Sequence, residues 1–157
     1  MERLWAPWRS EYITCKKINE CIFCKAWKEK KDEENYLLLR GKYSLVMLNA
    51  YPYNNGHLMI APCKHTASLK SLKKEEREEM MDFVLQMIDL LKEVLNPEGF
   101  NLGMNLGKIA GAGVAEHLHL HIVPRWKGDN NFMPVITNTR VISESLRETY
   151  RKLRKKI

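Results

Sequence analysis

The sequence predicts an α+β fold with helices on one face of a sheet: an antiparallel sheet of about five strands, crossed by one long helix and followed by a C-terminal helix. Three observations predict it. Short apolar segments that alternate as strands do are separated by turn residues, one helical run spans residues 73–95, and the connections between the first strands are too short for parallel pairing. With 157 residues, of which 45% are hydrophobic, the chain suits a single domain (residues 1–157) with a sizeable core.

The first half of the chain supplies three strands. After an irregular arm (residues 1–20), residues 22–32 suit a short helix. Residues 36–40 and 44–49 have strand composition and are joined by the turn sequence RGK, which predicts a hairpin. A third strand at residues 57–61 follows a cluster of proline, asparagine and glycine that is typical of a turn.

The second half begins with the long helix. Apolar side chains recur at helical spacing in residues 73–95, and the sequence NPEG then ends the helix. We expect its methionines to pack in the core rather than around a cofactor. A fourth strand at residues 100–106 has an apolar face and a second face of small and amide side chains: Asn101, Gly103, Asn105 and Gly107. A last helix is expected over residues 143–155, with Ser143 as its N-cap.

The charge balance restricts the class of partner. A formal net charge of +7 favours phosphates, nucleotides or other anions. Much of the excess lies in the last eleven residues, where it also suits a helix C-terminus, and no nucleic-acid-binding motif accompanies it. We therefore expect no nucleic-acid partner. No apolar run approaches the length of a membrane span, and the start MERLWAPWRSEY lacks the apolar core of a secretory signal, so a soluble cytoplasmic protein is expected.

The segment EHLHLHIVPRW (residues 116–126) carries the most specific pattern. We expect a fifth strand over residues 116–123, ended by Pro124. His117, His119 and His121 then share one face, with about 6.5–7 Å between the Cα atoms of neighbours. The opposite face is apolar and is expected in the core: Leu118, Leu120 and Ile122.

Two chemistries fit three histidines on one face. Alternate strand histidines can bind a metal ion, and a neutral imidazole can attack phosphorus to form a covalent intermediate. The loop at residues 108–114 is rich in glycine and alanine, so its backbone amides can approach an anion.

The pattern His-φ-His-φ-His-φ-φ-Pro-Arg, in which φ is hydrophobic, resembles the signature of the histidine triad (HIT) family of nucleotidyl hydrolases and transferases. Upstream, LNAYPYNNGHLMIAPCKH (residues 48–65) resembles the segment of that family that carries a fourth histidine. The resemblance covers roughly residues 20–126. It implies a single HIT domain, an adenosine polyphosphate or related nucleotide as substrate, and a homodimer.

The resemblance also implies roles for individual residues. His119 matches the nucleophile, His121 the residue that contacts the α-phosphate, and His57 the fourth histidine. Residues matched to the nucleotide and its phosphates are Asn49 at the ribose, Asn105 at the phosphate and leaving group, and the amides of Ala112, Gly113 and Val114. Trp126 directly follows the histidine strand and is a candidate to cover the nucleotide, although core packing explains it equally well.

The sequences LWAPWR near the N-terminus and RWKGDNNF (residues 125–132) resemble a bacterial subgroup of the family, the diadenosine tetraphosphate (Ap4A) phosphorylases. The family often has glutamine or serine at the positions of Gly113 and Val114, and this chain lacks that side-chain donor. The expected activity is phosphorolysis of Ap4A to ADP and ATP. Hydrolysis of dinucleoside polyphosphates or phosphoramidates with release of AMP, and nucleotide binding without turnover, remain alternatives.

Cys21 and Cys24 form a C-x-x-C pair, which is typical of a metal or redox site. Some relatives carry zinc on two cysteines and two histidines, and the matching residues here are Cys21, Cys24, His65 and His117. Two cysteines with two histidines form a closed tetrahedral set, so a structural zinc ion is expected. Cys63 remains an outside candidate as a ligand.

Overall fold

The computed structural model describes residues 20–129 and 141–157. The LWAPWR sequence, the last part of RWKGDNNF and all but the end of the expected arm lie outside the described residues.

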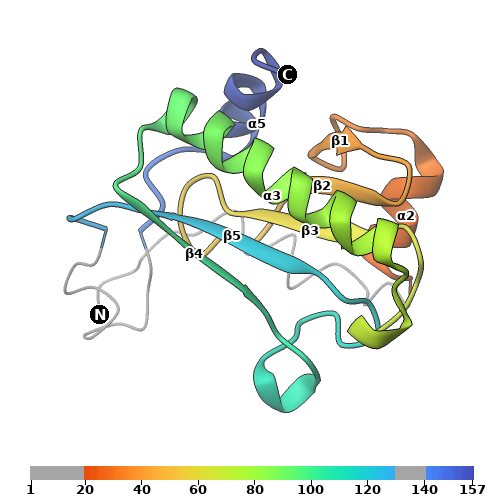
Figure 1. Ribbon diagram of the computed structural model, residues 1–157. Coiled ribbons are helices and arrows are strands. Elements are labelled where there is room, and N and C mark those ends of the chain that lie inside the picture. Colours follow the sequence, from red (N-terminus) through yellow and green to blue (C-terminus); the bar gives the residue numbers. More distant parts are fainter. Residues whose placement is uncertain (1–19, 130–140) are drawn as a thin grey trace, which may run out of the picture.

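A five-stranded antiparallel sheet forms the centre of the molecule, as predicted (Figure 1). Its order is β1-β2-β3-β5-β4. The strands are β1 (Leu37–Arg40), β2 (Ser44–Leu48), β3 (Leu58–Pro62), β4 (Gly99–Met104) and β5 (Leu120–Arg125). The first three strands follow one another as hairpins, and β5 then pairs with β3 on one side and β4 on the other. The histidine segment therefore enters the interior of the sheet, and β4 lies at its edge.

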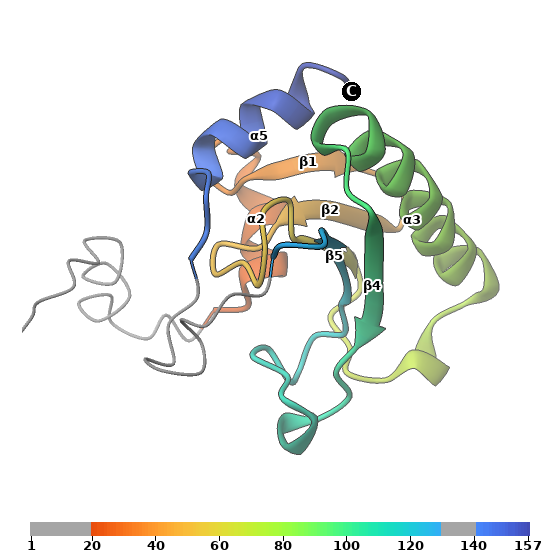
Figure 2. The same cartoon turned by 90° about the vertical axis from the view of Figure 1, so that its left-hand side faces the viewer.

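Helices cover both faces of the sheet (Figures 1 and 2). On one face α3 (Lys74–Leu95) and α5 (Leu146–Arg154) pack against the larger apolar cluster, which contains Leu118, Leu120 and Ile122 as expected. The α3 helix ends at Asn96, whose left-handed backbone (φ 47°) closes its last turn. The expectation that the helices lie on one face was wrong for α2 (Ile22–Glu29), because its buried Phe23 and Ala26 pack on the opposite face.

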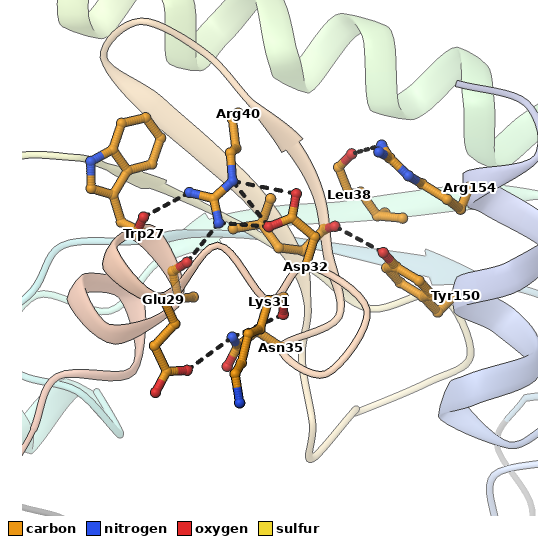
Figure 3. Close-up of polar contacts among 11 residues, drawn as sticks. Trp27, Glu29, Lys31, Asp32, Asn35, Leu38, Arg40, Tyr150 and Arg154 are labelled. Atoms are coloured by element: carbon orange, nitrogen blue, oxygen red, sulfur yellow. Dashed lines mark hydrogen bonds and ion pairs between the residues drawn. The ribbon is translucent and has the colours of Figure 1, made fainter.

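Arg40 fixes α2 on the sheet (Figure 3). Its guanidinium donates to the carbonyl oxygens of Trp27 and Ala26 in the last turn of the helix, each at 2.8 Å, and pairs with Asp32 at 2.6 Å. A cation at this position satisfies carbonyl groups that the helix leaves without partners. The start of α2, where the C-x-x-C pair lies, is thereby held at a defined place beside the histidine segment.

Two expected boundaries were wrong. Strand β5 starts at Leu120 rather than at residue 116, and it continues through Pro124 to Arg125. Proline is tolerated there because the Pro124 carbonyl accepts from the Asn54 side chain, on the side where β3 has already ended, so the missing N–H costs no bond to β4. The last helix is capped by Ser145, whose Oγ accepts from the Glu148 amide, and not by Ser143.

Within residues 20–129 and 141–157, no helix is long and apolar enough to cross a membrane.

Candidate active site and metal centre

The four predicted metal ligands come together beside the start of α2. Cys21 and Cys24 approach from the helix, His65 from the segment after β3, and His117 from the segment before β5. Their ligand atoms all lie within 4.8 Å of one another. Cys63, the outside candidate, is not part of the cluster; burial raises the pKa of its thiol to about 12, and the nearby Glu79 carboxylate adds to this.

The spacing of these atoms fits a tetrahedral ion. The Cys21 sulfur lies 3.1 Å and the Cys24 sulfur 3.6 Å from His117 Nδ1, and Cys24 lies 3.3 Å from His65 Nδ1. The two Nδ1 atoms are 3.1 Å apart. A zinc ion with Zn–S of about 2.3 Å and Zn–N of about 2.0–2.1 Å separates sulfur from nitrogen by about 3.5 Å and nitrogen from nitrogen by about 3.4 Å. These four distances each lie within about 0.4 Å of the tetrahedral values, so the cluster can hold a metal ion after a small adjustment.

The backbone prepares His117 for this role. Its Nε2 lies 2.8 Å from the Pro62 carbonyl oxygen, which can only accept, so Nε2 carries the hydrogen and Nδ1 presents its lone pair to the cluster. Burial lowers the pKa of His117, which favours the neutral ring that a metal ligand needs.

A backbone carbonyl fixes the tautomer of His119. Its Nδ1 lies 2.8 Å from the His117 carbonyl oxygen, so Nδ1 carries the hydrogen and the lone pair is on Nε2. The ring is 4% exposed and packs against Phe23 of α2, with ring centres 5.0 Å apart. The His117 ring also packs against Phe23, with ring centres 5.0 Å apart. The helix thus restricts both the metal ligand and the ring beside it.

A chain of hydrogen bonds fixes the tautomer of His121. The Tyr53 backbone N–H donates to His57 Nδ1 at 3.0 Å, so His57 carries its hydrogen on Nε2. His57 Nε2 lies 2.8 Å from His121 Nδ1, which must therefore accept. The hydrogen of His121 is then on Nε2, where it can be donated to a phosphoryl oxygen. Burial, and next the neighbouring His119, lower the pKa of His121 to about 4, so the ring is neutral near pH 7.

A cavity of about 280 Å³ adjoins His121 on the side of β4. It is lined by residues 101–103 of β4, by every second residue of β5 from His121 to Arg125, and by Tyr53 and Asn54 from the segment before β3. The sequence predicted amide and small side chains on this face of β4, a polar surface suited to an anion, but it named neither Asn101 nor Gly103 as an individual site residue, and neither Arg125 nor Asp129. The alternation of side chains along these two strands is the sequence feature that could have indicated a polar cavity here.

Comparison with known protein families matches residues 30–128 to the HIT domain. The chain belongs to the HIT family. An AP-4-A phosphorylase of Mycobacterium tuberculosis is 40% identical over 161 residues, covering 98% of this chain and 83% of that protein. The adenosine 5'-monophosphoramidase hnt1 of Schizosaccharomyces pombe is 31% identical over 67% of this chain and 74% of its own length.

Solved HIT structures have the same fold. A Zn-bound histidine triad family protein from Mycobacterium smegmatis superposes with a TM-score of 0.67 at 26% identity, over 87% of this chain and 91% of that chain. A histidine triad nucleotide-binding protein from Sulfolobus tokodaii gives the same TM-score and identity over 86% and 87%. This chain is thus a HIT-family enzyme, and the α+β fold predicted from its sequence is confirmed.

Some of the residues matched to the nucleotide lie beside the histidines or line the cavity, and one lies away from them. Asn49 follows β2 directly, and its Nδ2 is 3.4 Å from His57 Nδ1. Asn105 lines the cavity and donates to the Gly111 carbonyl at 3.3 Å. Trp126 lies apart from the histidines, because its indole N–H donates to the Asn96 carbonyl at the end of α3.

The loop before the histidine segment is only partly available to a phosphate. The Ala112 amide donates to the Gly107 carbonyl at 3.3 Å, and Val114 packs against the apolar cluster under α2. Gly113 has open space around the position of a Cβ.

Proposed function

We propose that this protein transfers a nucleotidyl group through a covalent intermediate on His119, and that its reaction is phosphorolysis of Ap4A to ADP and ATP. The observation that carries the proposal is the state of His119: the backbone carbonyl of His117 holds Nδ1–H and leaves the Nε2 lone pair for attack. The 40% identity with an AP-4-A phosphorylase over nearly the whole chain supports the choice of reaction.

In the first step His119 Nε2 forms a bond to an α-phosphorus. The bond from that phosphorus to the bridging oxygen breaks, and the oxygen leaves with the electron pair as part of ATP. The ring becomes cationic, and its Nδ1–H hydrogen bond to the His117 carbonyl stabilises the charge. His121 donates Nε2–H to a phosphoryl oxygen, where negative charge develops. In the second step an oxygen of inorganic phosphate attacks the same phosphorus, which releases ADP and restores neutral His119.

One further feature supports an acceptor other than water. The positions where the family often has glutamine or serine hold Gly113 and Val114, neither of which has a donor side chain. Asn49, beside His57, is proposed to contact the ribose of the transferred nucleotide, and Asn105 and the amides of Gly113 and Val114 its phosphate and leaving group, because the Ala112 amide is already bonded to the Gly107 carbonyl.

We propose that the metal bound by Cys21, Cys24, His65 and His117 is a structural zinc ion. All four positions of a tetrahedron are filled by protein atoms, which leaves no position for substrate. The ion would tie the start of α2 to the segments that flank β3 and β5.

We also propose that residues 1–157 form a single cytoplasmic domain that dimerises through β4. This strand is at the edge of the sheet, and Leu102 and Leu106 in and after it are 49% and 56% exposed. Among the described residues this edge of the sheet pairs with no further strand, and an edge with exposed leucines is the kind of surface that a second copy covers. Sedimentation or size-exclusion analysis with light scattering gives the test: a monomer at micromolar concentration would contradict it.

The experiment that tests the function is product analysis with Ap4A, with and without inorganic phosphate. ADP and ATP that appear only with phosphate support the proposal. AMP and ATP formed without phosphate indicate a hydrolase. If neither appears, adenosine 5'-phosphoramidate is the next substrate to try, because one relative is named a monophosphoramidase.

A further inference from the structure

The cavity beside His121 lies on the side of the triad opposite to the site proposed for the transferred nucleotide. In the sheet, His121 is flanked by β3 and by β4: His57, just before β3, is 2.8 Å away, while Gly103 of β4 is its register partner. Asn49 lies beyond His57, whereas the cavity extends over β4 and β5. A substrate with a nucleotide on each side of the reacting phosphorus therefore needs both regions.

We infer that this cavity holds the leaving nucleotide, and that Gly103 keeps it open. The inference rests on the function proposed above. From His121 to Arg125 the cavity follows β5 over four residue steps, about 13 Å at the rise of a strand. That length gives room for more than the phosphate next to the reacting centre.

The missing side chain at position 103 matters for the space that it leaves in the cavity. The backbone conformation there does not call for glycine. A Cβ built there meets no atom within 4 Å, so a larger side chain would enter the cavity without displacing the protein. In an edge strand glycine is otherwise unfavourable, because it packs against nothing and loses backbone entropy. The missing side chain leaves the floor of the cavity open directly beside His121.

The far end of the cavity carries hydrogen-bond donors that the protein already holds in place and that have no net charge. Asp129 accepts from Arg125 at 2.6 and 2.9 Å and from Asn54 at 2.8 Å, so the one charged pair among the described lining residues neutralises itself. Arg125 also donates to Asn101 Oδ1 at 2.8 Å, which fixes the amide with Nδ2 as its remaining donor. Hydrogen-bond donors without net charge suit a phosphate oxygen or the polar edge of a nucleoside, and they release a product more readily than a strongly cationic pocket.

The test is equilibrium binding of AMP and Ap4A by calorimetry, in a His119→Ala background that prevents turnover. Gly103→Leu should weaken Ap4A binding by about tenfold or more and leave AMP binding within about twofold, because AMP has no second nucleotide. Gly99→Leu is the matched control: it lies on the same face of β4, its Cβ also meets nothing within 4 Å, and it does not line the cavity. It should change neither affinity.

Asn101→Ala provides a second variant with little risk to the fold, and it should weaken Ap4A but not AMP. Equal weakening of AMP and Ap4A by Gly103→Leu would overturn the inference, because the cavity would then hold the transferred nucleotide. Unchanged Ap4A affinity in both cavity variants would overturn it as well. If the His119→Ala protein binds neither nucleotide, the proposed function fails, and that result is distinct from either outcome above.

Discussion

The link from Tyr53 through His57 to His121 leads to a quantitative prediction. His57 is fully buried and meets His121 Nδ1 at 2.8 Å, so we expect it to act as a positioning residue that never touches the substrate. His57→Ala leaves a buried acceptor on His121 without its donor, which costs about 1–3 kcal/mol. If about 2 kcal/mol of this is lost from the transition state, kcat/KM for Ap4A phosphorolysis falls by roughly 30-fold.

His121→Ala should be more damaging, because it removes the donor to the phosphoryl oxygen itself. Loss of one such donor lowers kcat by about 10²–10³-fold. The double variant separates the two roles: once His121 is absent, removing His57 as well should cost almost nothing more.

The assay is steady-state kinetics of all three variants, with thermal unfolding measured in parallel because a buried ring is deleted. The reasoning is refuted if the losses of the two single variants multiply in the double variant. His57 would then act on the substrate directly, or only through the stability of the fold.

Three other predictions follow from the same geometry. His119→Ala should abolish turnover while AMP binding and the unfolding temperature stay near those of the parent, and measurable turnover would exclude it as the nucleophile. Cys24→Ala should reduce the zinc content, measured by elemental analysis, well below one equivalent and lower the unfolding temperature. Cys63→Ala is the control outside the cluster and should keep its zinc. Full zinc occupancy in both variants would rule out the assigned ligands. Burial, and next the neighbouring His119, lower the pKa of His121 from 6.5 to about 4. Between these two pH values the unfolded chain binds more protons than the folded protein, so the free energy of unfolding falls as the pH drops. Urea unfolding at pH 7 and pH 5 should show this loss, and His121→Asn should reduce it; an equal loss in the variant would contradict the assignment.

The sequence predicted the elements better than their ends. The five strands and the long helix follow from apolar periodicity, which tertiary packing only reinforces. Pro124 was expected to stop β5, but whether a proline ends a strand depends on which side its missing N–H faces, and this is decided by the neighbouring strand. Ser145 and Ser143 are equally good caps by residue type, and only the backbone of the folded chain distinguishes them.

The site shows the same limit. The resemblance named the ligand set and the histidines, because their spacing is a property of the sequence. It could not give the tautomers, since the atom that fixes His57 is a backbone N–H of Tyr53, which no residue pattern records. The small and amide face of β4 was predicted, but the full extent of the cavity was not, because Arg125 and Asp129 join its lining only when β5 continues past Pro124.

The proposed metal site and the proposed nucleophile His119 both depend on His117, but they use different parts of it. His117 offers its ring to the metal cluster and its carbonyl oxygen to His119 Nδ1. A substitution of the His117 side chain therefore leaves the hydrogen bond that fixes the His119 tautomer chemically intact. Loss of the metal can therefore affect the reaction only by shifting the backbone of His117. The His117 ring contacts Phe23 of α2 and the Pro62 carbonyl of β3, and these contacts hold that backbone in place. Consequently, His117→Ala should lower stability more than it lowers the activity of the molecules that remain folded, whereas a metal that acted on substrate would abolish activity at any temperature.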